Sequence, residues 1–296
     1  MTARGTLSPA PFHLASHVSR RVDRRVAGEE FAMPSQDRHI RNVLKLFDAN
    51  GHRHDRYRLF SDCMELIALS ISNSVDLCSR PDREVRYFEI VGRYDRPAVE
   101  MFAQVFAEIT MALEAGLNDV LGHIFTELEI HNKNRGQFFT PYAVCQMMAQ
   151  VTLGGADEAQ ALIGAKGFVR AMEPACGAGA MVIALAEVVR AAGINYQRHL
   201  HVTAVDIDSR AVHMAYIQFA LLHIPAHVIV GNSLSLETRE HWFTPAHILG
   251  GWSARLANQA VPAGQQTICA LPVPNKQPAH LPPAAASGPG EQLTLF

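Results

Sequence analysis

The sequence contains few cysteines and no paired cysteine motif. Its five cysteines are an odd number, and none is separated from another by CxxC spacing. Structural zinc sites commonly use such pairs, and a disulfide framework needs an even set of partners. We therefore expect reduced thiols in a cytoplasmic protein, without a disulfide framework or a structural zinc site.

The chain also lacks long apolar runs and an excess of charge of either sign. No run reaches the roughly 18 residues of a membrane span, and the first residues contain no apolar signal core. The 26 Lys and Arg residues nearly balance the 28 Asp and Glu residues, giving a formal charge of −2. A global positive field that attracts nucleic acid is thus excluded. We expect no membrane partner, and we expect DNA contact through local residues, a tether or a partner.

Histidine is the residue type that most suggests a metal, with fifteen in the chain. The pairs His52/His54 and His199/His201 lie in polar stretches without a matching cluster of cysteines or carboxylates. Metal sites normally combine several such ligands. We therefore expect solvated histidines at these four positions and no metal.

Changes in composition divide the chain into five segments. Residues 1–35 form a basic tail without periodicity, predicted to be disordered, with phosphate contact as the alternative. Apolar residues recur at helical spacing over 36–135, which predicts a helical domain of four or five helices. Residues 136–257 have a different pattern and form the third segment. Seven of the sixteen prolines fall within 258–291, which predicts a linker, and residues 292–296 regain apolar character.

The third segment alternates short apolar runs with helical patterns. Strands are predicted over 168–172, 201–205 and 227–230, with helices over 180–192 and 209–223. This alternation is typical of a βαβαβ unit with a parallel sheet. No convincing strand follows the third run, so the sheet is expected to be partial.

Each predicted strand ends in residues suited to binding a nucleoside. The first leads into E-P-A-C-G-A-G at 173–179, where glycines let the backbone approach a ligand before a helix begins. The second ends at Asp206, whose carboxylate can accept ribose hydroxyl protons, and Ile207 can cover a base. The third ends at Asn232, whose amide can pair with the edge of a base. The alternative is a sheet of this kind whose glycines only pack.

These motifs, together with G-Q-F-F-T-P at 136–141, resemble the ordered cofactor motifs of the adenine-N6 DNA methyltransferases. The resemblance extends over residues 37–236 and is greatest to the modification subunits of type I restriction-modification systems. It implies an α/β fold, with a Rossmann-like S-adenosylmethionine-dependent methyltransferase domain preceded by an α-helical domain. The residues that it implies for S-adenosylmethionine are Phe139, Thr140, Pro141, Glu173, Pro174, Cys176, Gly177, Gly179, Asp206, Ile207 and Asn232.

The catalytic tetrapeptide of that family is missing from the sequence. Members use Asn/Asp-Pro-Pro-Tyr/Phe, in which the amide orients the target amine and the aromatic ring stacks on the flipped base. Pro282-Pro283 lacks both an amide and an aromatic residue. The run 267–274 ends in prolines, but Leu271 stands where the amide belongs. The catalytic residues therefore stay unassigned.

Three interpretations of function follow from these motifs. The chain is a DNA adenine-N6 methyltransferase whose active site is completed by a partner or an unrecognised segment, or it is an inactive, DNA-associated regulatory or binding subunit. A third interpretation is that the chain methylates RNA or protein glutamine. A specificity or catalytic subunit is an expected partner in the first case.

Two further segments carry specific expectations. Residues 242–252 contain both tryptophans, which we expect to pack in a core, with base stacking as the alternative. Residues 292–296, Q-L-T-L-F, resemble the short peptide by which bacterial replication and repair proteins bind the DNA sliding clamp. The side chains that this resemblance implies for the contact are Gln292, Leu293, Leu295 and Phe296.

Overall fold

The computed structural model describes residues 36–51, 53–128, 139–258 and 293–294. All of these belong to the compact unit Pro34–Phe296, which is distinct from Met1–Met33. The predicted basic tail, most of the predicted linker, and Gln292, Leu295 and Phe296 lie outside the described residues.

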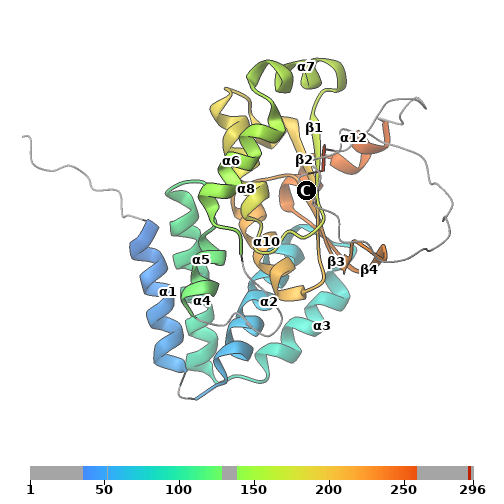
Figure 1. The fold of residues 1–296 in the computed structure, drawn as a ribbon. Coiled ribbons are helices and arrows are strands. Elements are labelled where there is room, and N and C mark those ends of the chain that lie inside the picture. Colours follow the sequence, from blue (N-terminus) through green and yellow to red (C-terminus); the bar gives the residue numbers. More distant parts are fainter. Residues whose placement is uncertain (1–35, 52, 129–138, 259–292, 295–296) are drawn as a thin grey trace, which may run out of the picture. The chain divides into compact units, whose positions relative to one another are not determined.

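Five helices form the first half of the described chain, in agreement with the helical spacing of its apolar residues (Figure 1). They are α1 (Gln36–Asn50), α2 (Arg56–Val75), α3 (Arg80–Val91), α4 (Arg96–Glu114) and α5 (Val120–Glu127). Asp55 and Asp95 cap α2 and α4, because each carboxylate accepts a backbone N–H of the first turn. Their core contains the buried rings of Phe47, Phe60 and Phe125, whose successive centroids lie 5.5 and 5.6 Å apart.

The second half is a mixed α/β arrangement around one mostly parallel sheet. Its strands are β1 (Val169–Glu173), β2 (Leu200–Asp206), β3 (Ala226–Asn232), β4 (Glu237–Phe243) and β5 (Leu293–Thr294), in the spatial order β4-β3-β2-β1-β5. The strands β1, β2, β3 and β5 run parallel, as their crossover positions require. The helices are α6 (Tyr142–Leu153), α7 (Ala156–Lys166), α8 (Ala180–Ala191), α9 (Tyr196–His199), α10 (Ser209–Leu221), α11 (Pro245–Leu249) and α12 (Trp252–Asn258).

The helices lie on both sides of this sheet. In Figure 1, α6, α8 and α10 stand to the left of the strands and α12 to the right. Because β1, α8, β2, α10 and β3 follow one another with successive strands adjacent, both crossovers proceed in the same direction across the sheet. The predicted strands and helices of 168–230 are confirmed, with ends that differ by one or two residues.

The expectation that no strand follows β3 is wrong. Strand β4 pairs antiparallel with β3 at the edge of the sheet. Its first five residues, E-T-R-E-H, are all exposed, so the apolar alternation that reveals a strand is absent. Gly231 makes the pairing possible, because a Cβ there would lie 2.5 Å from the carbonyl oxygen of Glu237.

The expectation of a solvated His201 is also wrong, since its side chain is only 2% exposed. It lies on the central strand β2, whose two faces are covered, and its Nε2 lies 2.9 Å from Nδ1 of the buried His247. Burial lowers the pKa of His201 to about 3 and that of His247 to about 4. The polar neighbours of His201 in sequence gave no sign of this, because burial of β2 depends on the strands beside it.

Both tryptophans pack in the interior as predicted. Trp252 is 1% exposed and contacts the ring of Phe168 at a centroid distance of 4.8 Å. The guanidinium of Arg255 covers its other side, 3.6 Å from the ring centroid. Trp242 is also buried and lies against Tyr216 of α10. Trp252 thus packs α12 against Phe168, and Trp242 packs β4 against α10.

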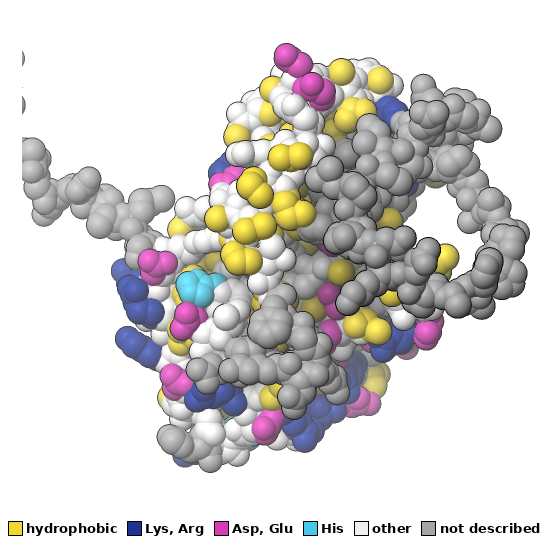
Figure 2. Space-filling model, in the orientation of Figure 1, with side chains coloured by type: hydrophobic (Ala, Val, Ile, Leu, Met, Phe, Trp, Pro, Cys, Tyr) yellow, Lys and Arg dark blue, Asp and Glu magenta, His cyan; other side chains and the backbone are white. Residues whose placement is uncertain are grey.

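The visible surface shows no single-sign field in its described part (Figure 2). Basic and acidic side chains are interspersed over the five N-terminal helices. Apolar side chains gather above them, where α6 exposes Val144, Met147 and Val151 on one helical stripe. Among the described helices, none combines the length and apolar character of a membrane span.

Candidate cofactor site

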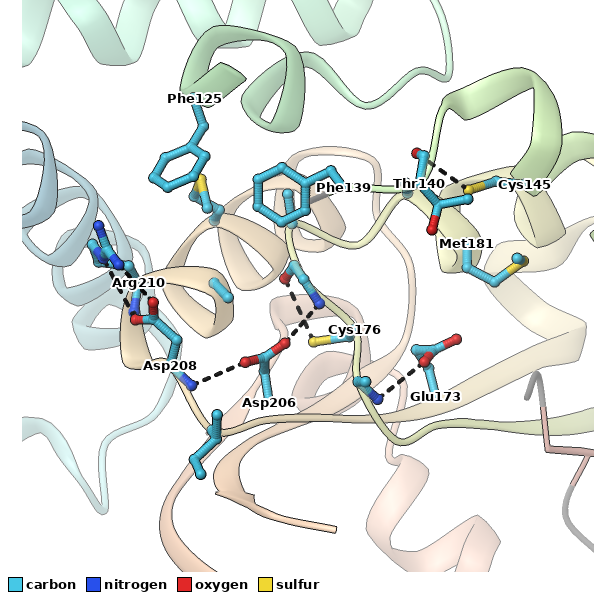
Figure 3. Close-up of a pocket in the computed structure, with 17 residues that line it drawn as sticks. Phe125, Phe139, Thr140, Cys145, Glu173, Cys176, Met181, Asp206, Asp208 and Arg210 are labelled. Atoms are coloured by element: carbon cyan, nitrogen blue, oxygen red, sulfur yellow. Dashed lines mark hydrogen bonds and ion pairs between the residues drawn. The ribbon is translucent and has the colours of Figure 1, made fainter. Parts of the chain in front are cut away.

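A cavity of about 240 Å³ lies at the carboxyl ends of β1 and β2 (Figure 3). This is the edge at which α/β sheets usually bind ligands. Seven of the predicted cofactor residues line it, namely Phe139, Thr140, Glu173, Cys176, Gly177, Asp206 and Ile207. The sequence motifs therefore converge on one cavity although they are far apart along the chain.

The glycine loop is held close to the cavity by its backbone. The N–H of Cys176 donates to the carbonyl of Val205 in β2 at 2.8 Å. Gly177 has a φ of +53°, and a Cβ there would lie 2.9 Å from the ring of Phe139. Only glycine fits this conformation and spacing without strain. The loop thus presents backbone, not side chains, to a ligand.

Asp206 links the two motifs that surround the cavity. One carboxylate oxygen accepts the N–H of Gly177 and the other accepts the N–H of Asp208, both at 2.9 Å. Burial raises its pKa, and these two hydrogen bonds act in the opposite direction. Each carboxylate oxygen can accept more than one hydrogen bond, so Asp206 can hold the loop and still accept hydroxyl donors.

Glu173 is the most deeply buried carboxylate of the cavity, with 1% of its surface exposed. Its Oε1 accepts the N–H of Ala175 at 3.0 Å, while Oε2 has no hydrogen-bond partner among the described residues. Burial raises its pKa to about 7, and the charge of Asp206 adds to this increase. A buried oxygen without a donor is costly, and a ligand with an N–H group would satisfy it.

The upper wall of the cavity is aromatic. The ring of Phe139 meets the ring of Phe125 of α5 at a centroid distance of 5.3 Å, at an angle of 65°. Beside them, Cys145 of α6 lies with its Sγ 3.8 Å from the carbonyl oxygen of Thr140. Burial raises the pKa of the Cys145 thiol to about 11, so it is an uncharged lining group and not a nucleophile at neutral pH.

Four predicted residues do not line the cavity: Pro141, Pro174, Gly179 and Asn232. Pro141 and Gly179 precede α6 and α8 and set where these helices begin. The side chain of Asn232 accepts backbone N–H groups from Leu234 and Ser235, at 2.9 and 3.3 Å. Its amide oxygen therefore shapes the loop after β3. Ile207 does line the cavity and is 63% exposed, as suits a side chain that is to cover a flat ring.

Several lining residues were missed in the sequence, including Phe125, Met181, Asp208, Arg210 and Met214. Arg210 is 4% exposed, and its guanidinium forms an ion pair with Asp208 at 2.6 Å. It also stacks on Tyr57 of α2, 3.9 Å from the ring centroid. Arg210 thereby joins the cavity to the helical half. A charged residue one helical turn after a motif carries no sequence signal of such a contact.

A buried amide joins the same two halves at the other side of the glycine loop. Gln218 of α10 donates from Nε2 to Asp119 and to the carbonyl of Ala178, both at 2.8 Å. Its Oε1 accepts the N–H of Leu121 at 3.1 Å. Asp119 in turn caps α5 by accepting the N–H of Gly122. Positioning of the glycine loop therefore depends on α5 as well as on the sheet.

The charges of the cavity favour a cationic ligand. Glu173, Asp206 and Asp208 contribute three carboxyl groups, and Arg210, which pairs with Asp208, contributes the one guanidinium among the lining residues. The aromatic and thioether side chains add an apolar wall. Within the described residues, no group of three or more histidine, cysteine or carboxylate side chains is arranged to hold a metal.

Residues 117–249 match the model of a family described as N-6 DNA methylase. Curated proteins give no match to the chain. The matched residues run from just before α5 to the end of α11 and include every residue that lines the cavity. The resemblance to adenine-N6 DNA methyltransferases, predicted from the ordered motifs, is thus confirmed for this segment, which is similar to the N-6 DNA methylase family.

Proposed function

We propose that the described domain is Rossmann-like, binds S-adenosylmethionine in this cavity and serves the methylation of the N6 amine of adenine in DNA. The observation that carries the proposal is Glu173 Oε2, a buried acceptor without a donor in a cavity rich in carboxylates. S-adenosylmethionine is a sulfonium with an ammonium group and ribose hydroxyls, so it supplies the missing positive charge and donors. When bound, it supplies an electrophilic methyl group.

The residues present fit this cofactor. Glu173 would accept from the ammonium group, and Asp206 would accept from the ribose hydroxyls. Gly177 leaves room at the loop, since a side chain there would meet Phe139. Ile207 would cover one face of the adenine ring. Phe125 and Phe139 exclude water from the wall opposite the carboxylates, which strengthens each of these contacts.

The chain's own residues thus bind and orient the methyl donor, whereas the target amine needs further groups. The sequence has no Asn/Asp-Pro-Pro-Tyr/Phe tetrapeptide, and the weaker candidates at 267–274 and 282–283 lie outside the described residues. We propose that a partner chain, such as the catalytic or specificity subunit of a restriction-modification system, completes the active site. We also propose a cytoplasmic location, which the free Cys63, Cys78, Cys145 and Cys176 support.

The proposal is tested by titrating the purified chain with S-adenosylmethionine in a calorimeter. Asp206→Ala should weaken binding by about 1.5–3 kcal/mol for each ribose hydrogen bond lost. Asp206→Asn is a partial control for the loop, because its one amide oxygen can still accept the N–H of Gly177 while the N–H of Asp208 loses its acceptor. Its affinity should fall between those of the other two proteins. A folded wild-type chain that does not bind the cofactor would refute the assignment.

A methylation assay tests the second half of the proposal. With labelled S-adenosylmethionine and unmethylated DNA, the isolated chain should transfer little or no label, since no amide orients the target amine. Robust transfer by the isolated chain would show that an unrecognised segment is catalytic, and 267–274 is the first to mutate.

Binding of a DNA sliding clamp by residues 292–296 stays a separate proposal. Leu293 and Thr294 form β5 beside β1, while Gln292, Leu295 and Phe296 lie outside the described residues. Because the same pentapeptide cannot pair with β1 and fill a clamp groove at once, clamp binding would require its release. A titration with the cognate clamp, comparing the full chain with Phe296→Ala, tests this proposal. Equal affinities would discard it.

A further inference from the structure

Two residues that line the cofactor cavity each carry a buried polar atom without a partner among the described residues. One atom is the acceptor Oε2 of Glu173, and the other is the donor Nη1 of Arg210. Both residues are buried, and in Figure 3 they lie on opposite sides of Asp206. A ligand that satisfies both atoms therefore needs a donor at one end and an acceptor at the other.

The contacts of Arg210 use the other parts of its guanidinium. Its Nε and Nη2 donate to the carboxylate of Asp208, at 3.5 and 2.6 Å. Tyr57 stacks on the guanidinium at 3.9 Å from the ring centroid, and the ring of Phe125 lies 5.4 Å away. Such rings attract the charge but leave the in-plane N–H groups free to donate. Nη1 therefore needs an acceptor close to the guanidinium plane, because a buried charged donor without one is costly.

The covalent structure of S-adenosylmethionine determines which of its groups can supply this acceptor. Under the proposed function, on which this inference rests, Glu173 accepts from the ammonium group and Asp206 from the ribose hydroxyls. The carboxylate of the cofactor is bonded to the same carbon as its ammonium group, so it stays near Glu173. The adenine ring lies beyond the ribose and can extend toward Arg210. Its ring nitrogens are acceptors whose lone pairs lie in the plane of the ring.

We propose that Arg210 recognises the adenine ring of the cofactor by donating from Nη1 to one of its ring nitrogens. Arg210 lies outside the motifs that carry the family resemblance, the nearest of which ends at Asp208. The ion pair with Asp208 and the stack on Tyr57 hold the guanidinium in one position. A nucleoside without the matching acceptor leaves this buried donor unpaired, so Arg210 determines specificity for the base.

Deaza forms of the cofactor test the contact atom by atom. The probes are S-adenosylmethionine and its 1-deaza, 3-deaza and 7-deaza forms, in each of which a C–H group replaces one ring nitrogen. In calorimetric titration of the wild-type chain, we expect one of the three forms to bind at least about tenfold more weakly than S-adenosylmethionine, because Nη1 loses its acceptor. Equal affinities of all four ligands would overturn the proposal.

Substitution of Arg210 shows whether it is the donor. In Arg210→Met, the discriminating form and S-adenosylmethionine should differ by less than about threefold, since no donor is left to lose its partner. Arg210→Lys keeps a cation beside Asp208 but has no second nitrogen, so the difference should shrink there too, and this variant serves if Arg210→Met does not fold.

A second arginine provides the matched control. Arg255→Met also removes a guanidinium that stacks on an aromatic ring, Trp252, but Arg255 does not line the cavity. This variant should retain the wild-type difference between the ligands. A tenfold difference that persists in the Arg210 variants would assign the contact to another group and overturn the proposal.

The same titrations separate this proposal from the proposed function. A folded wild-type chain that does not bind S-adenosylmethionine loses both. A chain that binds S-adenosylmethionine and all three deaza forms equally retains the cofactor site and loses the role of Arg210.

Discussion

Replacing Glu173 by glutamine separates the stability of the chain from its proposed function. Glutamine has nearly the same shape, and its Oε1 can still accept the N–H of Ala175. It cannot ionise and cannot carry a negative charge toward a cationic ligand. The substitution therefore removes the charge of a carboxyl group that is 1% exposed and places an amide NH2 group at the position of Oε2.

The magnitude follows from the pKa of Glu173, which burial raises to about 7 in the folded chain. In the unfolded chain a glutamate has a pKa of roughly 4.3. Because the folded value is the higher one, the folded state binds more protons between these two pH values. The stability from this group is present below about pH 4 and is lost as the pH rises through about 7. Between pH 5 and pH 8 the loss is about 2–3 kcal/mol.

The assay is urea unfolding of both proteins at pH 5 and pH 8, without cofactor. Between pH 5 and pH 8, the free energy of unfolding of the wild type should fall by about 2–3 kcal/mol more than that of Glu173→Gln. The other titrating groups are common to both chains and do not contribute to this difference. The amide of glutamine brings two N–H groups for which the described residues show no acceptor, and this lowers the stability of the variant by a similar amount at every pH. Identical pH dependence in the two chains would refute a buried, ionisable Glu173. The variant should also bind S-adenosylmethionine more weakly, and unchanged affinity would remove Glu173 from the cofactor site.

Three other substitutions test different parts of the fold. Burial lowers the pKa of His201 to about 3 and that of His247 to about 4. The free energy of unfolding that these neutral histidines contribute is therefore present above about pH 6.5 and is lost as the pH falls toward 4. In urea unfolding at pH 5, His247→Gln should reduce this acid-induced loss of free energy by about 2 kcal/mol. Gly179 has a φ of +102°, and Gly179→Ala places a Cβ 2.5 Å from the ring of Phe219. Calorimetric melting should show a loss of stability of about 2–4 kcal/mol. Gln218→Leu should weaken cofactor binding and destabilise the chain by about 2–3 kcal/mol, because Asp119 and Ala178 lose their donor, whereas a change in neither would show that the loop is positioned without α5.

The sequence was sufficient to predict the elements whose side chains repeat with a clear period. The strands and helices of 168–230 and the five N-terminal helices all follow from such periods. Strand β4 does not, because E-T-R-E-H is polar on both faces of an edge strand. Its position depends on Gly231, where the backbone of β4 approaches more closely than any side chain would allow. Contacts of this kind appear only when the two strands are placed together.

The same distinction applies to the cofactor site. Gly177 and Asp206 line the cavity, and both could be singled out because they lie at strand ends, which the sequence locates well. Arg210 was missed because its role depends on Asp208 and on Tyr57, a ring in a helix that precedes it by more than a hundred residues. Cys176 and Cys145 are lining groups with raised thiol pKa values, and their burial is likewise a property of the assembled cavity.

The helical half, α1 to α5, therefore also contributes residues to the cavity and to its support. Phe125 of α5 forms part of the cavity wall, Asp119 holds Gln218 against the glycine loop, and Tyr57 of α2 supports Arg210. Each of these contacts ends on a residue at the carboxyl edge of β1 or β2, or on the helix that follows it. Gln218 is hydrogen-bonded both to the glycine loop and to α5, so we expect a ligand that orders the loop to strengthen the contacts with α5 as well. Cofactor binding should then raise the stability of the two halves together, because neither cavity wall is complete without the other.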